Sequence, residues 1–406
     1  MKSSIFTSAD ILLPREHFEQ WSVIACDQFT SNSEYWESVD DTIGAVPSTR
    51  HLIYPEVYLG KTDAAKVTDD INRTMQEYLD NGIYQSYPDA LIYVERTQSD
   101  GKLRLGLIGA VDLDEYDYNE GSASKIRATE KTVLERIPPR VEIRKNAPTE
   151  LPHILMLMDD RKGEIIEPLQ RMAADGKMKL LYDFDLMLGG GHLRGYLVPN
   201  EYNEAICQKV AALGDLHGGI TLAVGDGNHS LATAKACREL GRTEQNRYAL
   251  CELINIHSEA LEFEPIYRTV ENIDSERLLR EFCNYLDKCE KAKNSNTPQD
   301  IVFVTDEQRI PLHIENPPHA LAVGTVQSFL YEILPNYPDA VIDYIHGEDE
   351  VQAVVSKGRA CGFLYNCMGK SELFDAVERE GVLPRKTFSM GHAKDKRYYT
   401  EVRKIK

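Results

Sequence analysis

The chain has 406 residues, 42% of them hydrophobic, which is enough apolar material for two or three domains. Lys and Arg number 46 against 65 Asp and Glu, which gives a formal net charge of −19. A surface this acidic repels nucleic acid and anionic membranes, so neither is expected as a partner. Any anion site must therefore be a local feature of the protein.

The sequence predicts a cytoplasmic protein with reduced thiols and leaves its oligomeric state open. Its eight cysteines lack CxxC or zinc-like spacing, and a chain of this length needs no disulfide staples. The N-terminal stretch MKSSIFTSADILL is interrupted by Ser, Thr and Asp, which makes it a poor signal peptide. No run approaches the ~20 apolar residues that a membrane span requires.

The N-terminal part is expected to bring a carboxylate to the end of a buried strand. Residues 22–25 have the pattern of a buried strand and are followed by Cys26, Asp27 and Gln28, which would lie in a loop. A carboxylate at a strand end is a common site position, although a loop Asp more often only stabilises a turn.

A helix and a hairpin are predicted next. In residues 61–85, apolar side chains repeat every four positions, and Gly82 provides a stop signal. Residues 90–95 and 103–112 have the composition of strands and are separated by the turn signal SDG, so they are expected to pair as a hairpin.

Positive charge is concentrated between 116 and 145 of this acidic chain. The segment contains Lys125, Arg127, Lys131, Arg136, Arg140, Arg144 and Lys145. We predict a helix that begins near Ile126 and ends at the proline pair 138–139.

Arginines in this segment are candidate phosphate ligands. The guanidinium fork matches the geometry of phosphate oxygens, so Arg127, Arg140 and Arg144 could together neutralise a polyphosphate. The alternative is a solvated helix face on which Glu130 and Glu135 pair locally with these cations.

The middle of the chain is predicted to hold two strands, a glycine-rich loop and a helix. Residues 151–160 indicate a buried strand and 180–185 a second one. The glycine run at 189–191 matches neither a Walker loop nor a dinucleotide fingerprint, and we expect it to be a mobile loop. A helix is expected at 201–213.

The stretch ITLAVGDGNHSLATAKACRELG, residues 220–241, predicts a strand, a tight turn and a helix. The turn would present Asp226, Asn228 and His229 beside the helix N-terminus. The N–H groups and the positive dipole end there favour an anion such as phosphate. The simpler alternative is that Asp226 or Asn228 only caps the helix.

The C-terminal half mixes strands and helices without a strict βαβ rhythm. We expect strands near 248–256, 261–270, 301–305, 341–344 and 362–365, helices near 275–289 and 323–334, a loop boundary at 291–299, and a basic, strand-like end. The predicted fold class is α+β, with mixed sheets and flanking helices.

Several segments, read together, resemble the domain-of-unknown-function family 1015 (DUF1015). They occur in family order over nearly the whole chain and are IACDQF, VDLDEYDY, IRATEKT, PPR, GDGNHSLATAK, EPIYRTV and LPRKTFSM. The central GDGNHS is also similar to the DGHHR signature of free serine kinases that have a ParB/sulfiredoxin-like fold.

The resemblance implies a ParB/sulfiredoxin-like core and three regions: 1–200 with the basic segment, 201–290 with the central motif, and 291–406 completing the site. It implies a kinase that phosphorylates free L-serine to O-phosphoserine, with pyrophosphate or ATP as donor. The choice of donor stays open.

The resemblance also implies residue roles. Asp226 would hold Mg²⁺ or accept the serine hydroxyl proton, and His229 would contact the transferring phosphoryl group. A second carboxylate, Glu130 or Asp27, would act as the general base or bind the metal ion. The residues that would bind substrate or donor are Asp27, Arg127, Arg140, Arg144, Gly227, Asn228, Ser230, Arg268 and Lys386.

This chain departs from the family pattern at three positions. Asn228 and Ser230 stand where members commonly have a second His and an Arg, and Tyr267 replaces a His. These substitutions leave donor binding and substrate identity open. The alternatives are therefore a non-catalytic phosphate- or nucleotide-binding protein and a metal-dependent phosphohydrolase.

Overall fold

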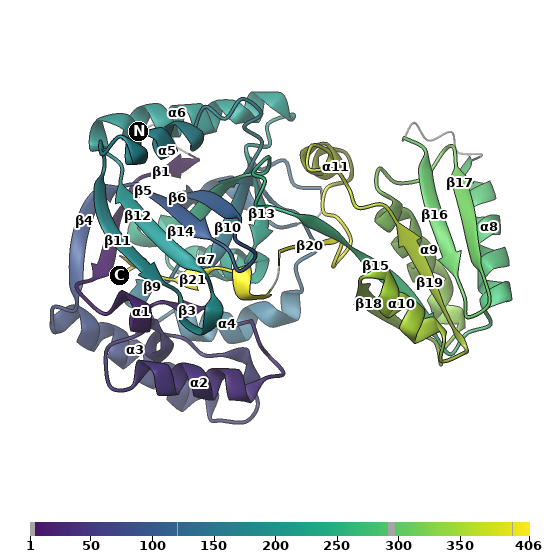
Figure 1. The fold of residues 1–406 in the computed structure, drawn as a ribbon, viewed down its shortest axis with the longest axis horizontal. Helices are drawn as coiled ribbons and strands as arrows, with labels where there is room; N and C mark the ends of the chain where they lie inside the picture. The colour runs from purple at the N-terminus through teal and green to yellow at the C-terminus, as the bar shows by residue number, and fades with distance from the viewer. Residues whose placement is uncertain (1–4, 120, 291–296, 392) are drawn as a thin grey trace. The chain divides into compact units, whose positions relative to one another are not determined.

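The computed structural model describes residues 5–119, 121–290, 297–391 and 393–406. Contacts divide the described residues into two compact units. Unit 1 takes its residues from Met1–Leu261 and Gly391–Lys406, and unit 2 takes them from Glu262–Met390 (Figure 1). The chain is thus divided at other positions than the expected boundaries at 200 and 290, because strand pairing brings the C-terminus back into unit 1.

Unit 1 is built around a mixed sheet of ten strands, counted over the described residues. In order across the sheet these are β11 (Lys179–Asp185), β12 (His192–Leu197), β5 (Ile92–Thr97), β6 (Leu103–Asp112), β14 (Tyr248–Asn255), β10 (Ile154–Met158), β13 (Leu222–Asp226), β8 (Ile126–Ala128) and β7 (Tyr116–Asp117), and β1 (Phe6–Thr7) pairs with β6. β10 runs parallel to β14 and antiparallel to β13. β13 is parallel to β8.

Helices and 3₁₀ turns surround this sheet. The helices are α1 (Phe18–Trp21), α2 (Ser33–Ile43), α3 (Ala64–Asp80), α4 (Ile137–Arg144), α5 (Glu167–Ala174), α6 (Asn203–Ala212) and α7 (Asn228–Leu240). The 3₁₀ turns are η1 (Thr49–Leu52), η2 (Glu56–Tyr58), η3 (Leu113–Glu115), η4 (Leu134–Arg136), η5 (Met187–Gly189), η6 (Asn200–Tyr202), η7 (Leu213–Leu216), η8 (Gln245–Arg247) and η10 (Ala393–Asp395).

The two faces of the sheet bury different cores. Along β5, Tyr93 packs into one core while Ile92 and Val94 pack into the other, as the two-residue period of a strand requires. The first core includes side chains of α5, α6 and α7, and the second includes Trp36 of α2. Figure 1 shows α5 and α6 on one side of the sheet and α2 on the other.

The last residues of the chain complete two small sheets of unit 1. One sheet has the order β4 (Tyr84–Ala90), β2 (Ala9–Pro14), β22 (Val402–Lys404), β9 (Thr149–Glu150). The other pairs β21 (Tyr398–Tyr399) with β3 (Val23–Ile24). The C-terminal segment is therefore held between strands from the first half of the chain.

Unit 2 contains a second sheet with its own helices. Its strands are β17 (Arg309–Ile314), β16 (Gln299–Val304), β19 (Ala360–Tyr365), β15 (Phe263–Glu271) and β18 (Val341–His346), with β20 (Phe388–Met390) paired to β15. Its helices are α8 (Ser275–Glu290), α9 (Ala322–Ile333), α10 (Glu348–Val355) and α11 (Glu372–Glu380), with the 3₁₀ turn η9 (Leu334–Asn336).

The α+β class with mixed sheets and flanking helices is confirmed, and so is the hairpin, which is formed by β5 and β6. None of the eight cysteines, all of them described, forms a disulfide. No described helix has both the length and the apolar character needed to cross a bilayer. Most of the predicted loop at 291–299 lies outside the described residues.

The helix predicted to begin near Ile126 is wrong, because residues 126–128 form strand β8 beside β13. Ile126 is fully buried within this sheet. The pairing of β8 with β13 therefore outweighs the local preference for a helix. The proline pair 138–139 does not end a helix. It lies in the first turn of α4, where a missing N–H costs nothing.

The glycine run at 189–191 is closely packed, which differs from the mobile loop that we predicted. A Cβ atom on Gly190 would lie 2.3 Å from the Tyr398 hydroxyl, and one on Gly191 would lie 2.0 Å from the Thr97 carbonyl oxygen. The glycines are needed here for close approach of backbone and side chains.

Candidate functional site

The predicted strand, turn and helix at 220–241 are confirmed as β13, Gly227 and α7. Gly227 is the N-cap and has φ +82°, a conformation that glycine adopts without strain. Gly227 has no side chain with which to cap this end of α7. The N–H groups of its first turn therefore point out of the helix toward the Asp226 turn.

His229 lies in that first turn, and its ring makes a contact within unit 1. Its Nε2 atom accepts a hydrogen bond from the Val133 N–H at 3.3 Å. In this arrangement the imidazole carries its proton on Nδ1. The predicted contact of His229 with a phosphoryl group stays a prediction.

A second group at the site is a pair formed by the buried His153 and by Asp27, whose side chain is 31% exposed. Asp27 follows β3, and His153 directly precedes β10. The His153 Nε2 atom lies 3.3 Å from the Asp27 carboxylate, and the His153 Nδ1 atom lies 2.9 Å from the Tyr399 hydroxyl. Gly227 borders this pair, because a Cβ there would lie 3.4 Å from the His153 ring.

Lys396 adds a positive charge between the two carboxylates. Its Nζ atom lies 3.4 Å from Asp226, and its charge also lowers the pKa of Asp27. With His153 protonated, two carboxylates and two cations meet beside the start of α7. Their formal charges sum to zero.

The Asp27–His153 pair has opposed pKa shifts. Burial alone would raise the pKa of Asp27, but the charge of the nearby His153 lowers it overall. Burial alone would lower the pKa of His153, but Asp27 raises it well above its ordinary value. The two groups thus favour the ion pair.

We expect this pair to make the effect of Asp27→Asn on stability depend on pH. Its stabilisation is complete between the unfolded pKa values, from about pH 4 to about pH 6.5. It is lost as pH falls through the lowered pKa of Asp27, and again as pH rises through the raised pKa of His153. Urea unfolding at pH 5.5 and at high pH should therefore give the larger loss at pH 5.5.

Asp215→Asn, at an exposed aspartate of the same unit, is the matched control and should have little effect at either pH. An equal loss for Asp27→Asn at both pH values would contradict the ion pair.

Buried arginines fix the segment that carries Lys396. The Arg96 guanidinium donates to the carbonyl oxygens of Lys396, Lys394 and Gly190, each at 2.8 Å. Its Cζ atom also lies 4.8 Å from the centroid of the Tyr398 ring. Lys396 is thus positioned by backbone contacts, independently of its ion pair with Asp226.

A cavity of about 200 Å³ adjoins this cluster within unit 1. Cys26, His153 and Tyr399 line one part of it, and Ser230 of α7 lines another. Apolar side chains form most of the remaining wall, and they are Leu52, Ile53, Tyr54, Leu59, Met75, Ile143, Ala147, Leu151, Ile154 and Leu250.

Two of the predicted arginines reach this cavity but are already ion-paired. Arg140 and Arg144 of α4 both line the cavity. Arg140 pairs with Glu56, and Arg144 pairs with the buried Glu150. A phosphate donor would have to compete with these carboxylates.

Glu130 and Arg127 lie on or next to β8. Because β8 runs parallel to β13 with Ala128 opposite Val224, Glu130 reaches the same sheet edge as Asp226. The Arg127 Nε atom donates to the Ser124 carbonyl at 2.9 Å. The strand register is therefore consistent with Glu130 as a candidate carboxylate of the site. Arg127, in contrast, is bound to the loop that precedes β8.

The remaining predicted residues belong to unit 2. Arg268 is fully buried, and its guanidinium donates to the carbonyl oxygens of Arg385 and Lys386 at 2.8 Å each. The EPIYRTV and LPRKTFSM segments thus contact each other through β15 and β20. Arg268 fixes the Arg385–Lys386 turn, and a donor-binding role for Arg268 and Lys386 stays a prediction.

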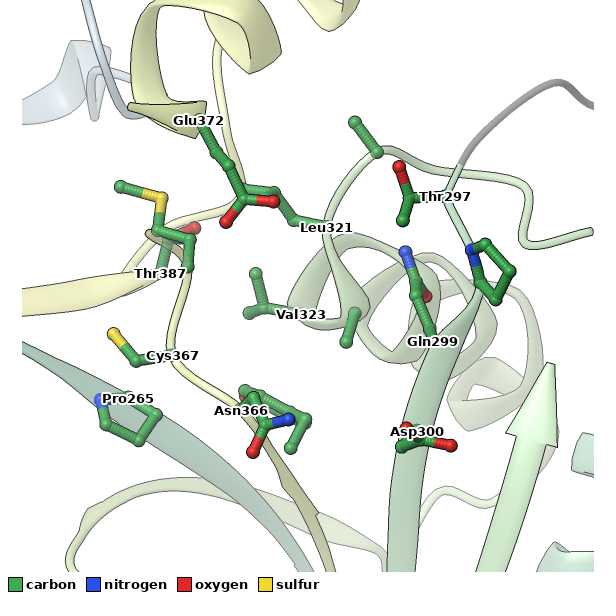
Figure 2. Close-up of a pocket in the computed structure, with 15 residues that line it drawn as sticks. Pro265, Thr297, Gln299, Asp300, Leu321, Val323, Asn366, Cys367, Glu372 and Thr387 are labelled. Carbon is green, nitrogen blue, oxygen red and sulfur yellow. The ribbon is translucent and has the colours of Figure 1, made fainter. Parts of the chain in front are cut away.

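Unit 2 has a cavity of about 150 Å³, which is shown in Figure 2. Its polar side chains are largely satisfied by the protein itself. Gln299 donates to the His319 carbonyl and accepts from the Thr325 hydroxyl, and the Thr387 hydroxyl donates to Pro384. We therefore place the candidate site at the charged cluster of unit 1.

The cluster can supply only part of a Mg²⁺ site. Among the described residues of unit 1 taken alone, no three His, Cys, Asp or Glu side chains have ligand atoms within 4.8 Å of one another. Mg²⁺ is usually held by one or two carboxylates together with substrate phosphates and water. Asp226 fits that kind of incomplete site.

Sequence reasoning missed His153, Lys396 and Tyr399. His153 stands at the start of an apolar run, and Lys396 and Tyr399 lie in the basic C-terminal segment. A polar residue at the entrance of a buried strand was a usable signal for His153. Nothing local distinguishes Lys396 from its neighbouring lysines.

Comparison with solved structures found distant matches. A conserved hypothetical protein from Pyrococcus furiosus is 12% identical, with 73% of this chain and 94% of that chain covered and a TM-score of 0.36. A free serine kinase mutant in complex with ADP is 11% identical, with 75% and 93% covered and a TM-score of 0.40. SbnI from Staphylococcus aureus is 11% identical, with 73% and 81% covered and a TM-score of 0.34.

Comparison with curated proteins gave no match. The family model described as "Protein of unknown function (DUF1015)" matches residues 7–332. Because this match spans more than half of the sequence, the chain belongs to the DUF1015 family.

Proposed function

We propose that this protein is a small-molecule kinase that transfers a phosphoryl group to the hydroxyl of free L-serine, with pyrophosphate or ATP as donor. The observation that carries the proposal is the meeting of Asp226, Lys396 and the Asp27–His153 pair beside the N-terminus of α7. Oppositely charged groups next to helix N–H donors are suited to a charged, phosphate-bearing substrate.

The start of α7 and Lys396 are assigned to the donor. Phosphoryl transfer needs little covalent chemistry from the protein, which must align the groups and stabilise charge on the equatorial oxygens. The first-turn N–H groups of α7, and the Lys396 ammonium at 3.4 Å from Asp226, are the hydrogen-bond donors assigned to that purpose. Lys396 would exchange its contact with Asp226 for one with a phosphate oxygen.

The carboxylates have separate tasks in this proposal. Asp27 has a lowered pKa because of His153, so it is a poor proton acceptor and acts by holding the imidazolium in place. Asp226 or Glu130 then accepts the serine hydroxyl proton. Mg²⁺, when bound through Asp226 and donor phosphates, would neutralise charge on the transferring group.

The test is a product assay with purified full-length protein, Mg²⁺ and L-serine. Pyrophosphate and ATP are supplied in separate reactions, and O-phosphoserine is measured by mass spectrometry. Product with one donor supports the proposal and also settles the choice of donor. No phosphorylated product with either donor, over a panel of small hydroxy compounds, would refute it.

The same assay separates the alternatives. Release of inorganic phosphate without any phosphorylated acceptor would indicate a phosphohydrolase. Binding of pyrophosphate or ATP by calorimetry without turnover would indicate a non-catalytic phosphate- or nucleotide-binding protein. Arg140 and Arg144 are already paired with carboxylates, and this observation supports the non-catalytic alternative.

A further inference from the structure

Unit 2 contains a hydrogen-bonded chain of a serine, a histidine and a glutamate. The His319 Nε2 atom lies 2.7 Å from the Ser328 hydroxyl oxygen, and the His319 Nδ1 atom lies 3.3 Å from the Glu380 carboxylate. An ionised carboxylate only accepts hydrogen bonds, so Nδ1 carries the imidazole proton and Nε2 accepts from the serine hydroxyl. A serine bonded to a base that a third group orients is the arrangement of an activated nucleophile.

The three residues come from separate elements of unit 2. His319 lies in the loop before α9, Ser328 lies within α9, and Glu380 is the last residue of α11. Glu380 is also fixed by a second contact, because its carboxylate accepts the Ala320 N–H. The glutamate thus holds both the imidazole and the backbone of the loop that carries it.

The position of His319 is determined by its backbone and by the shape of α9. The Gln299 side chain donates to the His319 carbonyl oxygen at 2.8 Å and accepts from the Thr325 hydroxyl at 2.9 Å. A Cβ atom on Gly324 would lie 3.0 Å from the His319 Cβ atom. Glycine at this point lets the histidine lie against the helix, one turn before Ser328.

The reacting groups are accessible, and their surroundings are acidic. The His319 side chain is 32% exposed and Ser328 is partly exposed. The exposed Glu332 lies one turn further along α9, which contains no Lys or Arg, and Glu380 lies on the other side of the imidazole. Two carboxylates near the serine repel an anionic substrate more than an uncharged one.

From this geometry we propose that unit 2 carries a second reactive centre, which transfers the acyl group of uncharged, activated esters to Ser328. Ser328 is the nucleophile, His319 is its general base, and Glu380 is a positioning residue. The proposal does not rest on the kinase function, because all three residues belong to unit 2 and the readout is the label on Ser328.

The step is an acyl transfer followed by hydrolysis. The Ser328 oxygen attacks the ester carbonyl carbon while its proton passes to His319 Nε2, and a C–O bond forms. The bond to the alcohol leaving group breaks, and the alcohol takes the proton from Nε2. Water then attacks the acyl group with the same help from His319, which releases the carboxylic acid and restores the serine.

The first test uses diisopropyl fluorophosphate, an uncharged reagent, on the full-length protein. A P–O bond to the serine forms, the P–F bond breaks, fluoride leaves, and the serine proton passes to the imidazole. Peptide mass spectrometry compares Ser328 with Ser356, an exposed serine of unit 2 whose hydroxyl donates to the Gln352 carbonyl. We expect Ser328 to react at least about 10-fold faster, and this preference to vanish in urea. Equal rates in the folded protein would overturn the proposal, whatever the variants show.

Two variants separate the base from the residue that positions it. His319→Gln removes the basic nitrogen, so labelling of Ser328 should fall to the rate at Ser356. Glu380→Gln keeps an oxygen for the Ala320 N–H but turns an amide donor toward Nδ1, so labelling should fall at least about 10-fold. Circular dichroism reports that each variant is folded. A folded His319→Gln protein with wild-type labelling would exclude the histidine as base.

Nitrogen-15 NMR of histidine-labelled protein distinguishes positioning from a merely structural role of Glu380. The wild-type His319 ring should carry its proton on Nδ1, and the ring in Glu380→Gln should carry it on Nε2. An unchanged tautomer in Glu380→Gln would contradict the assigned role.

Two nitrophenyl esters test the substrate class. Nitrophenyl acetate is uncharged, and nitrophenyl hemisuccinate carries one carboxylate. The part of nitrophenol release that Ser328→Ala abolishes is due to this serine, and we expect that part to be about 3-fold larger for the acetate. Ser356→Ala is the matched control and should release nitrophenol at the wild-type rate. Equal losses for the two esters would contradict the preference for uncharged substrates, and no loss for either would refute the acyl transfer.

Discussion

For the proposed kinase, Asp226→Asn is expected to lower kcat/KM for phosphoryl transfer to the acceptor by about 10³-fold, because the proposal places this charged group at the reacting centre. Asn keeps the shape of the side chain, and its carbonyl oxygen can still accept the Gly227 N–H that Asp226 Oδ1 accepts at 3.0 Å. We therefore expect the free energy of unfolding to change by less than about 1 kcal/mol. The measurement pairs steady-state kinetics with urea unfolding.

Asp215→Asn provides the control for this substitution. It makes the same chemical change at an exposed position in unit 1 and should leave both kcat/KM and stability unaltered. Activity that survives Asp226→Asn would mean that the turn is only structural. Loss of activity together with loss of folding would assign Asp226 a structural role in place of a role in the reaction.

The turn at Asp226 could be predicted because its signals are local. An apolar run that ends at Gly-Asp-Gly specifies a strand and a turn without reference to the rest of the chain. The same holds for the hairpin of β5 and β6, whose turn signal lies between its two strands.

The partners of Asp226 could not be found in the same way. Lys396 is far away in sequence, and it reaches the site because β21 pairs with β3 and buried arginines hold its backbone. His153 and Tyr399 meet for the same reason. Strand pairing between distant segments leaves no pattern in the local sequence from which the partner of a residue could be identified.

The basic segment shows how local reasoning also misleads. Residues 126–128 fit a helical start, but they form strand β8, which lies between β13 and β7 in the sheet. Arg140 and Arg144 do converge on one cavity, as expected, yet each meets a carboxylate that sequence could not assign to it. A cluster of cations in a sequence therefore predicts a charged region better than it predicts a phosphate site.

The second large effect concerns the buried ionic network that holds the C-terminal segment in unit 1. The Arg397 Nε atom lies 3.2 Å from Glu252, and its guanidinium also pairs with Glu401. Glu252 is shared with Arg104, whose guanidinium lies 3.4 Å away. All four side chains are at most 3% exposed, so removing one charge leaves its partners without compensation in a poorly solvated place.

Arg397→Met is therefore expected to lower the free energy of unfolding of unit 1 by about 3–5 kcal/mol. Tryptophan fluorescence is the appropriate probe, because both tryptophans, Trp21 and Trp36, are fully buried in unit 1. Trp21 also donates to the Thr400 carbonyl at 2.9 Å, so it reports directly on the C-terminal segment.

Arg73→Met is the matched control, because Arg73 makes an exposed ion pair with Asp70 on α3 of the same unit. Exposed pairs contribute only about 0.2–1 kcal/mol, so this variant should unfold at nearly the wild-type urea concentration. A similar small loss for Arg397→Met would mean that water or side-chain rearrangement compensates Glu252 and Glu401. In that case β21 and β22, rather than the ionic network, would hold Lys396 and Tyr399 at the site.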